Sequence, residues 1–204
     1  RLGQGVCLAI VFFCVAMAVE AQTLTILRGV VHDSLGKHMF DNAIFFADKL
    51  VTLSQGDPDD VYRLAQTYLF TKQYRRALSL LRKTRQSLTS TRFRYLTAKC
   101  LAECQEWDEV LATLSADAIQ KAHDEASAAA GDVVISEMGR LSMVSAMELL
   151  KGSVYESLEN YPLAARCYSS ALRADPLNQV SFTLHFFHVS RHFPHASLAM
   201  FPPI

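Results

Sequence analysis

The stretch AMELLKGSVYESLENYPLAARCYSSALRADPLN, residues 146–178, decides the fold of this 204-residue chain. Its apolar and small residues recur at helical spacing on either side of Glu159, which predicts two antiparallel helices joined by a tight turn. Gly152 and Ala164 are expected to face each other at the helix crossing, because small side chains let two backbones approach closely. Pro176 lacks an amide hydrogen and is expected to end the second helix.

Aromatic side chains complete the expected packing of this helix pair. Tyr155, Tyr161 and Tyr168 are expected to fill the space around the crossing and to reach toward neighbouring pairs. The whole pattern resembles the tetratricopeptide signature at most of its characteristic positions, and it departs from that signature at Glu148, where a large aromatic is common. This resemblance implies an all-α protein whose helix pairs stack into a right-handed solenoid.

Two earlier stretches, residues 61–83 and 93–114, fit the same template. Ala65 and Ala98 occupy the place of Gly152 and lie 33 residues apart, close to the period of about 34 residues for tetratricopeptide repeats. The next interval, from Ala98 to Gly152, is 54 residues and therefore contains an insertion. The other packing positions of these two units are Tyr68, Tyr74, Ala77, Leu81, Leu101, Trp107, Val110 and Leu114.

The sequence predicts a fourth helix pair upstream and a loop inside the insertion. Phe40, Ala43, Ala47 and Leu50 form the inner stripe of a second helix, and the helix before it is expected over about residues 24–35. The repeat array is therefore expected to cover residues 24–178. Residues 115–140 are rich in Ala, Ser and Gly and lack a strong apolar face, so a surface loop is expected there.

Both ends of the chain lie outside this predicted array. Residues 1–23 contain an apolar run, VCLAIVFFCVAMAV, which is typical either of a secretory signal peptide or of a gene-model artefact. Residues 179–204 are rich in Phe and His, and we expect a non-repeat tail. A metal site is not expected in this tail, because Pro194 would interrupt a helix that carries its histidines. These are His185, His188, His192 and His195.

Composition argues against several classes of function. Twenty Lys and Arg balance twenty Asp and Glu, so the chain has no electrostatic reason to bind nucleic acid or a membrane surface. The five cysteines form neither a disulfide framework nor a paired zinc motif. Cys100 and Cys104 lie one helical turn apart, and we interpret them as small apolar helix residues in a reducing compartment.

No pattern of catalytic residues emerges from the sequence. There is no nucleophile–base pairing, phosphate-binding glycine loop or carboxylate pair, so no enzyme activity, cofactor or metal is expected. Asp57, Asp59 and Asp60 precede a predicted helix, where they would cap free amides and favour the helix dipole. Residues 72–85 contain six Lys and Arg, which indicate a solvated helix face or, alternatively, a surface for an acidic partner.

A more specific resemblance covers about residues 27–178. It rests on AIFFADKLVTLS (residues 43–54), DVYRLAQTYLFTKQYRRA (residues 60–77) and RFRYLTAKCLAECQEWDEVL (residues 92–111). These stretches resemble the amino-terminal part of the cell division cycle protein sixteen family. Members of that family are tetratricopeptide scaffold subunits of the anaphase-promoting complex, or cyclosome.

This resemblance implies a non-catalytic scaffold of a multi-subunit ubiquitin ligase that controls mitotic progression, located in nucleus and cytoplasm. It implies contacts with other subunits of the complex and a homodimer through the amino-terminal repeats. Phe45 and Phe46 are the expected interface residues, because one helix cannot turn both toward the same neighbour. The alternative is a secreted or membrane-tethered tetratricopeptide adaptor with an unrelated partner, a hypothesis that rests on residues 1–21.

Overall fold

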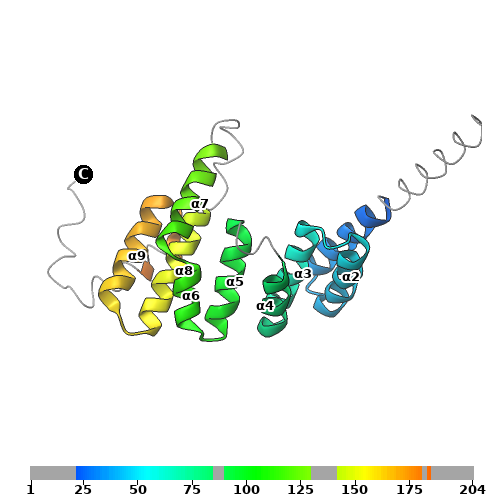
Figure 1. Ribbon diagram of the computed structural model, residues 1–204, viewed down its shortest axis with the longest axis horizontal. Helices are drawn as coiled ribbons and strands as arrows, with labels where there is room; N and C mark the ends of the chain where they lie inside the picture. Colours follow the sequence, from blue (N-terminus) through cyan, green and yellow to red (C-terminus); the bar gives the residue numbers. More distant parts are fainter. Residues whose placement is uncertain (1–21, 85–89, 130–141, 181–182, 185–204) are drawn as a thin grey trace, which may run out of the picture. The chain divides into compact units, whose positions relative to one another are not determined.

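The computed structural model describes residues 22–84, 90–129, 142–180 and 183–184 of the chain. All regular secondary structure in these ranges is α-helical, and the helices follow one another as antiparallel pairs, which confirms the expected all-α class of tetratricopeptide type (Figure 1). The chain divides into two compact units, residues 1–84 and residues 85–204.

The first unit contains a helix over residues 22–36, followed by α2 (Phe40–Leu53), α3 (Pro58–Phe70) and α4 (Tyr74–Lys83). Helix α3 packs against both α2 and α4. Asp57 caps α3, because its side chain accepts a hydrogen bond from the Asp59 amide at 2.9 Å. The side chains that form the centre of this unit are fully buried: Val31, Ala43, Ala47, Leu50, Ala65, Ala77 and Leu81.

The second unit contains α5 (Thr91–Glu103), α6 (Trp107–Thr113), α7 (Ala116–Ala129), α8 (Met143–Ser157) and α9 (Tyr161–Ala174). Helices α8 and α9 form the most extensive pair, and α8 also packs against α5, α6 and α7. Its fully buried side chains are Phe93, Ala98, Cys100, Val110, Leu114, Met147, Val154, Ala164, Tyr168 and Ala171.

One turn geometry recurs in each helix pair and gives direct structural support for the repeat. His38, Lys72, Gln105 and Glu159 all adopt left-handed backbone conformations, with φ between 57° and 62°. The residue after each of them donates its amide to the carbonyl five positions earlier, at 2.8 to 3.0 Å, as in a Schellman motif. The intervals between these turns are 34, 33 and 54 residues, which match the register predicted from the sequence.

The buried positions follow the same register. Seven residues before each turn lies a buried residue of the first helix: Val31, Ala65, Ala98 and Gly152. Five residues after each turn lies a fully buried residue of the second helix: Ala43, Ala77, Val110 and Ala164. Because these positions are small or β-branched in all four pairs, the two helices of each pair can pack closely.

The prediction of a surface loop over residues 115–140 is wrong for its first half. Residues 116–129 form α7, which packs against α5 and α8. Three residues on one side of α7 are buried, namely Ala118, Ile119 and Ala122. Two of them are alanines, so the apolar stripe is too weak to stand out in the sequence although it is sufficient for packing. Residues 130–141 lie outside the described residues.

The described start of the predicted non-repeat tail is helical. Residues 179–180 and 183–184 are helical, and the Thr183 hydroxyl donates to the Gln179 carbonyl at 2.9 Å. Gln179 follows Ser145, in the first turn of α8, by 34 residues. The first helical residue of this stretch therefore lies 36 residues after Met143, the first residue of α8, which is close to one repeat length. The four tail histidines, like the apolar run near the amino terminus, lie outside the described residues.

Candidate functional site

Most of the residues predicted to pack the repeat lie in the interior of the helix pairs. The side chains of Tyr74, Trp107, Tyr155 and Tyr161 are half-buried. Pro176 is exposed and follows Asp175, whose extended backbone ends α9, as expected for a residue before proline. The remaining predicted positions are buried: Ala65, Tyr68, Ala77, Ala98, Gly152, Ala164 and Tyr168.

The atoms nearest to a Cβ placed at Gly152 belong to the Tyr168 side chain, and the expected position of Ala164 opposite Gly152 stays a prediction. A Cβ atom at Gly152 would lie 2.7 Å from Cδ1 of Tyr168 and closer still to Cε1. The Tyr168 hydroxyl donates to Oε2 of Glu156 at 2.7 Å, and burial raises the pKa of this tyrosine. The aromatic ring therefore lies directly against the backbone of α8, which leaves no space for a side chain at Gly152.

The departure from the tetratricopeptide signature at Glu148 is accommodated by a polar contact. Glu148 is half-buried, and burial raises the pKa of its carboxyl group. It shares a hydrogen bond with the thiol of Cys167 on α9, and burial raises the pKa of Cys167 to about 12. A thiol with this pKa stays protonated at neutral pH, so the pair links two helices and does not supply a nucleophile.

The other described cysteines give no sign of reactivity or of metal binding. Cys100 is fully buried, and burial raises its pKa to about 12. Cys104 lies one turn later and is half-buried. Within the described ranges, no three His, Cys, Asp or Glu side chains come close enough together to hold a metal ion.

An ion pair between Arg28 and Asp60 was missed by the sequence analysis. Arg28 donates from Nε at 2.8 Å and from Nη2 at 2.7 Å to the two carboxylate oxygens of Asp60. The Asp60 side chain is fully buried, whereas that of Arg28 is 37% exposed. The hydrogen bonds to Asp60 also raise the pKa of Arg28. The pair joins the helix of residues 22–36 to the start of α3, so Asp60 does more than favour the helix dipole.

A second buried carboxylate holds the two ends of the last helix pair together. Asp175 is 8% exposed and accepts hydrogen bonds from the amides of Ser142 at 3.1 Å and Leu177 at 3.0 Å. Beside it, the Asn178 side chain donates to the Ser145 hydroxyl at 2.9 Å. The polar groups between the start of α8 and the end of α9 therefore hydrogen-bond to one another and stabilise the helix pair.

Apolar surface remains exposed on α2, where the sequence predicted an interface. Phe45 is 57% exposed, and Phe46 is half-buried. Their rings meet edge to face with centroids 5.3 Å apart, and Nζ of Lys49 lies 5.7 Å from the Phe45 ring centre. Leu53, two turns after Phe45, is 56% exposed. One side of α2 thus presents aromatic and aliphatic surface to solvent.

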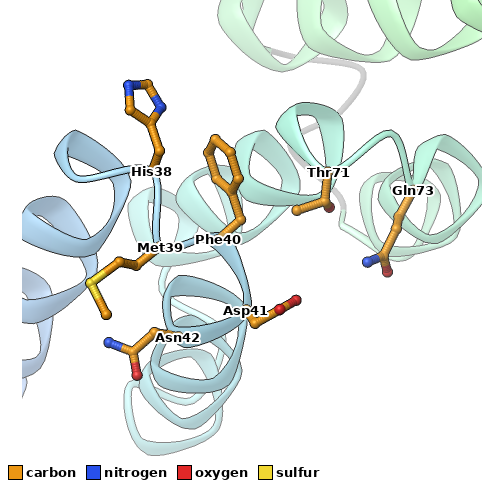
Figure 2. A pocket seen from close by; sticks show the side chains of 7 residues that line it. All are labelled: His38, Met39, Phe40, Asp41, Asn42, Thr71 and Gln73. Atoms are coloured by element: carbon orange, nitrogen blue, oxygen red, sulfur yellow. The ribbon is translucent and has the colours of Figure 1, made fainter.

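A separate pocket of about 600 Å³ opens beside the first turn of α2 and the turn between α3 and α4 (Figure 2). Its aromatic part is formed by Phe40, whose ring centroid lies 6.3 Å from that of Phe70. The residues that line it are His38, Met39, Phe40, Asp41, Asn42, Thr71 and Gln73. The pocket combines a few apolar side chains with one carboxylate and carries no catalytic grouping.

None of the helices in the described part of the chain combines the length and the apolar character needed to cross a membrane.

Comparison with protein families and curated proteins agrees with the helix-pair register. A sequence model of the family described as anaphase-promoting complex, cyclosome, subunit 3 matches residues 36–116. The chain is 39% identical over 155 residues to anaphase-promoting complex subunit 6 of Arabidopsis thaliana, which covers 74% of the chain and 28% of that protein. It is 32% identical to the cell division cycle protein 16 homolog of Homo sapiens, covering 73% of the chain and 25% of that protein.

Solved structures show the same fold. A crystal structure described as the APC/C hetero-tetramer Cut9-Hcn1 matches with a TM-score of 0.65 and 29% identity, over 80% of this chain and 28% of that chain. A crystal structure of MamA protein matches with a TM-score of 0.58 and 19% identity, over 83% of this chain and 82% of that chain, which shows the fold alone.

The chain spans about a quarter of the length of the curated relatives that it matches. Sequence and fold nevertheless agree on one group of proteins, because the Cut9 match in structure accompanies a 33% identity over 144 residues to anaphase-promoting complex subunit cut9 of Schizosaccharomyces pombe. The chain is therefore similar, in sequence and in fold, to the tetratricopeptide-repeat subunits of the anaphase-promoting complex, among them the cell division cycle protein 16 homologs.

Proposed function

We propose that the chain acts as a non-catalytic scaffold subunit of the anaphase-promoting complex, a multi-subunit ubiquitin ligase that controls mitotic progression. The observation that carries this proposal is the combined match in sequence and in helix-pair fold to cut9 and its relatives. The local chemistry supports it, because the buried Asp60 and Asp175 and the half-buried Glu148 contact neighbouring helices. These polar groups stabilise the fold, and we therefore infer that the protein acts through protein–protein contact.

Location in nucleus and cytoplasm is part of this proposal, since the complex acts on mitotic regulators. The relatives lend no support to the alternative of a secreted or membrane-tethered adaptor. That alternative rests on residues 1–21, which lie outside the described residues.

The proposal is tested by affinity capture of the tagged full chain from cells arrested in mitosis, followed by mass spectrometry. We expect other subunits of the anaphase-promoting complex to be captured with it. The matched control is tagged MamA, which shares the fold at 19% identity without the family resemblance. Capture of a folded chain with no more of these subunits than the MamA control would contradict the proposal.

We also propose that the chain forms a homodimer through its first repeats, with Phe45 and Phe46 in the interface. Support comes from the exposed apolar side of α2, where Phe45 and Leu53 are both more than half exposed. Apolar surface gathered on one helix favours burial against a second copy. The edge-to-face contact between the two phenylalanine rings holds both side chains in a defined arrangement.

Replacing Phe45 and Phe46 by Glu is expected to convert a dimer into a monomer at about 50 µM, because two carboxylates would lose hydration on burial. Light scattering on size-separated protein measures the mass. Phe70→Glu is the matched control, since Phe70 is 55% exposed on α3, and it should leave the dimer intact. Phe45→Glu alone, which spares the half-buried Phe46, separates dissociation from unfolding. A monomeric parent protein would refute the dimer. A dimer that persists both in the Phe45→Glu, Phe46→Glu variant and in Phe45→Glu would place the interface elsewhere.

A further inference from the structure

Helix α4 presents an exposed surface made almost entirely of cations. Within its ten residues, Arg75, Arg76, Arg82 and Lys83 are all exposed, and Ser79 lies among them. The helix contains no acidic residue. At 100° per residue these five side chains fall within an arc of about 120°, opposite the buried side of the helix. We call this arc the basic face of α4.

A favourable interaction with the helix dipole explains only two of these four cations. Arg82 and Lys83 lie in the last turn, where a cation interacts favourably with the helix dipole. Arg75 and Arg76 lie in the first turn, where the dipole disfavours cations and where carboxylates are usual. Residues that break such a local rule are expected at functional surfaces.

The edge of the basic face is held in place by neighbouring side chains. The Arg76 guanidinium carbon lies 4.7 Å from the ring centre of Tyr68, which is buried. Nη1 of Arg76 donates to Oε1 of Gln73 at 2.6 Å. A guanidinium oriented in this way loses less conformational entropy when it pairs with a carboxylate. The face is therefore partly preorganised for anion recognition.

We propose that the basic face of α4 binds an acidic segment of a protein partner. The inference goes beyond the proposed scaffold function, because it rests on α4 alone. A ten-residue helix is about 15 Å long, which suits a short run of Asp or Glu side chains. A nucleic-acid site needs a longer track of phosphate contacts and usually a basic domain, whereas this chain has a formal net charge of zero.

Fluorescence anisotropy with a labelled decaglutamate peptide tests the proposal on the purified full chain. The variant Arg75→Gln, Arg82→Gln, Lys83→Gln removes three charges from the basic face. The matched control Lys37→Gln, Arg166→Gln, Arg173→Gln removes three exposed cations that lie outside α4. We expect the α4 variant to weaken binding about tenfold, as the combined loss of three exposed ion pairs, and the control to weaken it less than about twofold.

Additional variants and control ligands distinguish a loss of charge from a loss of folding. Arg75→Lys, Arg82→Lys should retain most of the affinity, and circular dichroism should show the same helix content in every variant. Binding should weaken when salt is raised, and decaglutamine should not bind. Absence of decaglutamate binding to the parent, or equal losses in the two triple variants, would overturn the proposal. So would tighter binding of a thymidine decanucleotide or of phosphatidylserine vesicles through the same three residues.

Discussion

Replacing Arg28 by Met is expected to lower the free energy of unfolding of the first unit by about 3 kcal/mol. The reason lies in Asp60, which is fully buried and whose two carboxylate oxygens both accept hydrogen bonds from Arg28. Methionine fills a similar volume but leaves a buried charge without its bidentate partner. Breaking such a pair from one side costs far more than the pair contributes as a whole, because desolvation of the carboxylate is no longer compensated.

Urea denaturation followed by circular dichroism measures this loss. Lys37→Met is the matched control, because its ion pair with Asp33 has the same 2.7 Å distance while both side chains are 63% exposed, and it should cost less than about 1 kcal/mol. Adding Asp60→Asn to Arg28→Met should recover part of the loss by removing the buried charge. Trp107, the single tryptophan, lies in the second unit, and its fluorescence emission serves as an internal reference. Equal losses for Arg28→Met and Lys37→Met would contradict the expected result.

The helix-pair register could be predicted from sequence because it depends on local spacing. Ala65, Ala98 and Gly152 recur at intervals that the left-handed turns of the structure reproduce. The ion pair between Arg28 and Asp60 could not be found in this way, because it joins residues 32 positions apart on different helices. Periodicity fixes which side of a helix is buried, but it does not specify which polar groups meet across an interface.

The error over α7 and the missed contact between Gly152 and Tyr168 have different physical origins. Among the described side chains of α7, the buried ones are two alanines and Ile119, so its apolar stripe is weaker than the signal by which helices are recognised. At Gly152 the spacing predicted a close approach but did not single out Tyr168 as the nearest side chain. The nearest side chain depends on the stagger of α9 along α8, which places the Tyr168 ring against the glycine. Stagger is set by the packing of large side chains, which the sequence pattern leaves open.

Replacing Gly152 by Ala is expected to destabilise the second unit by about 2 kcal/mol, although alanine is the better helix former. The new methyl group would lie well inside contact distance of the Tyr168 ring. That ring is fully buried and its hydroxyl is bonded to Glu156, so it cannot move aside without losing packing or a hydrogen bond. Overpacking of this kind therefore outweighs the gain of about 1 kcal/mol in helix propensity.

Gly29→Ala provides a control with the opposite expected sign. Gly29 also lies within a helix, but apart from its chain neighbours and the adjacent backbone of its own helix, no atom lies within 4 Å of the position of its missing Cβ. Alanine there should stabilise the first unit by up to about 1 kcal/mol. Trp107 emission during urea denaturation reports the Gly152 variant, and circular dichroism reports the Gly29 variant. Combining Gly152→Ala with Tyr168→Leu should cost less than the sum of the two single changes, because removing the ring relieves the contact. Additive losses in this cycle would show that the tyrosine is not what excludes a side chain from Gly152.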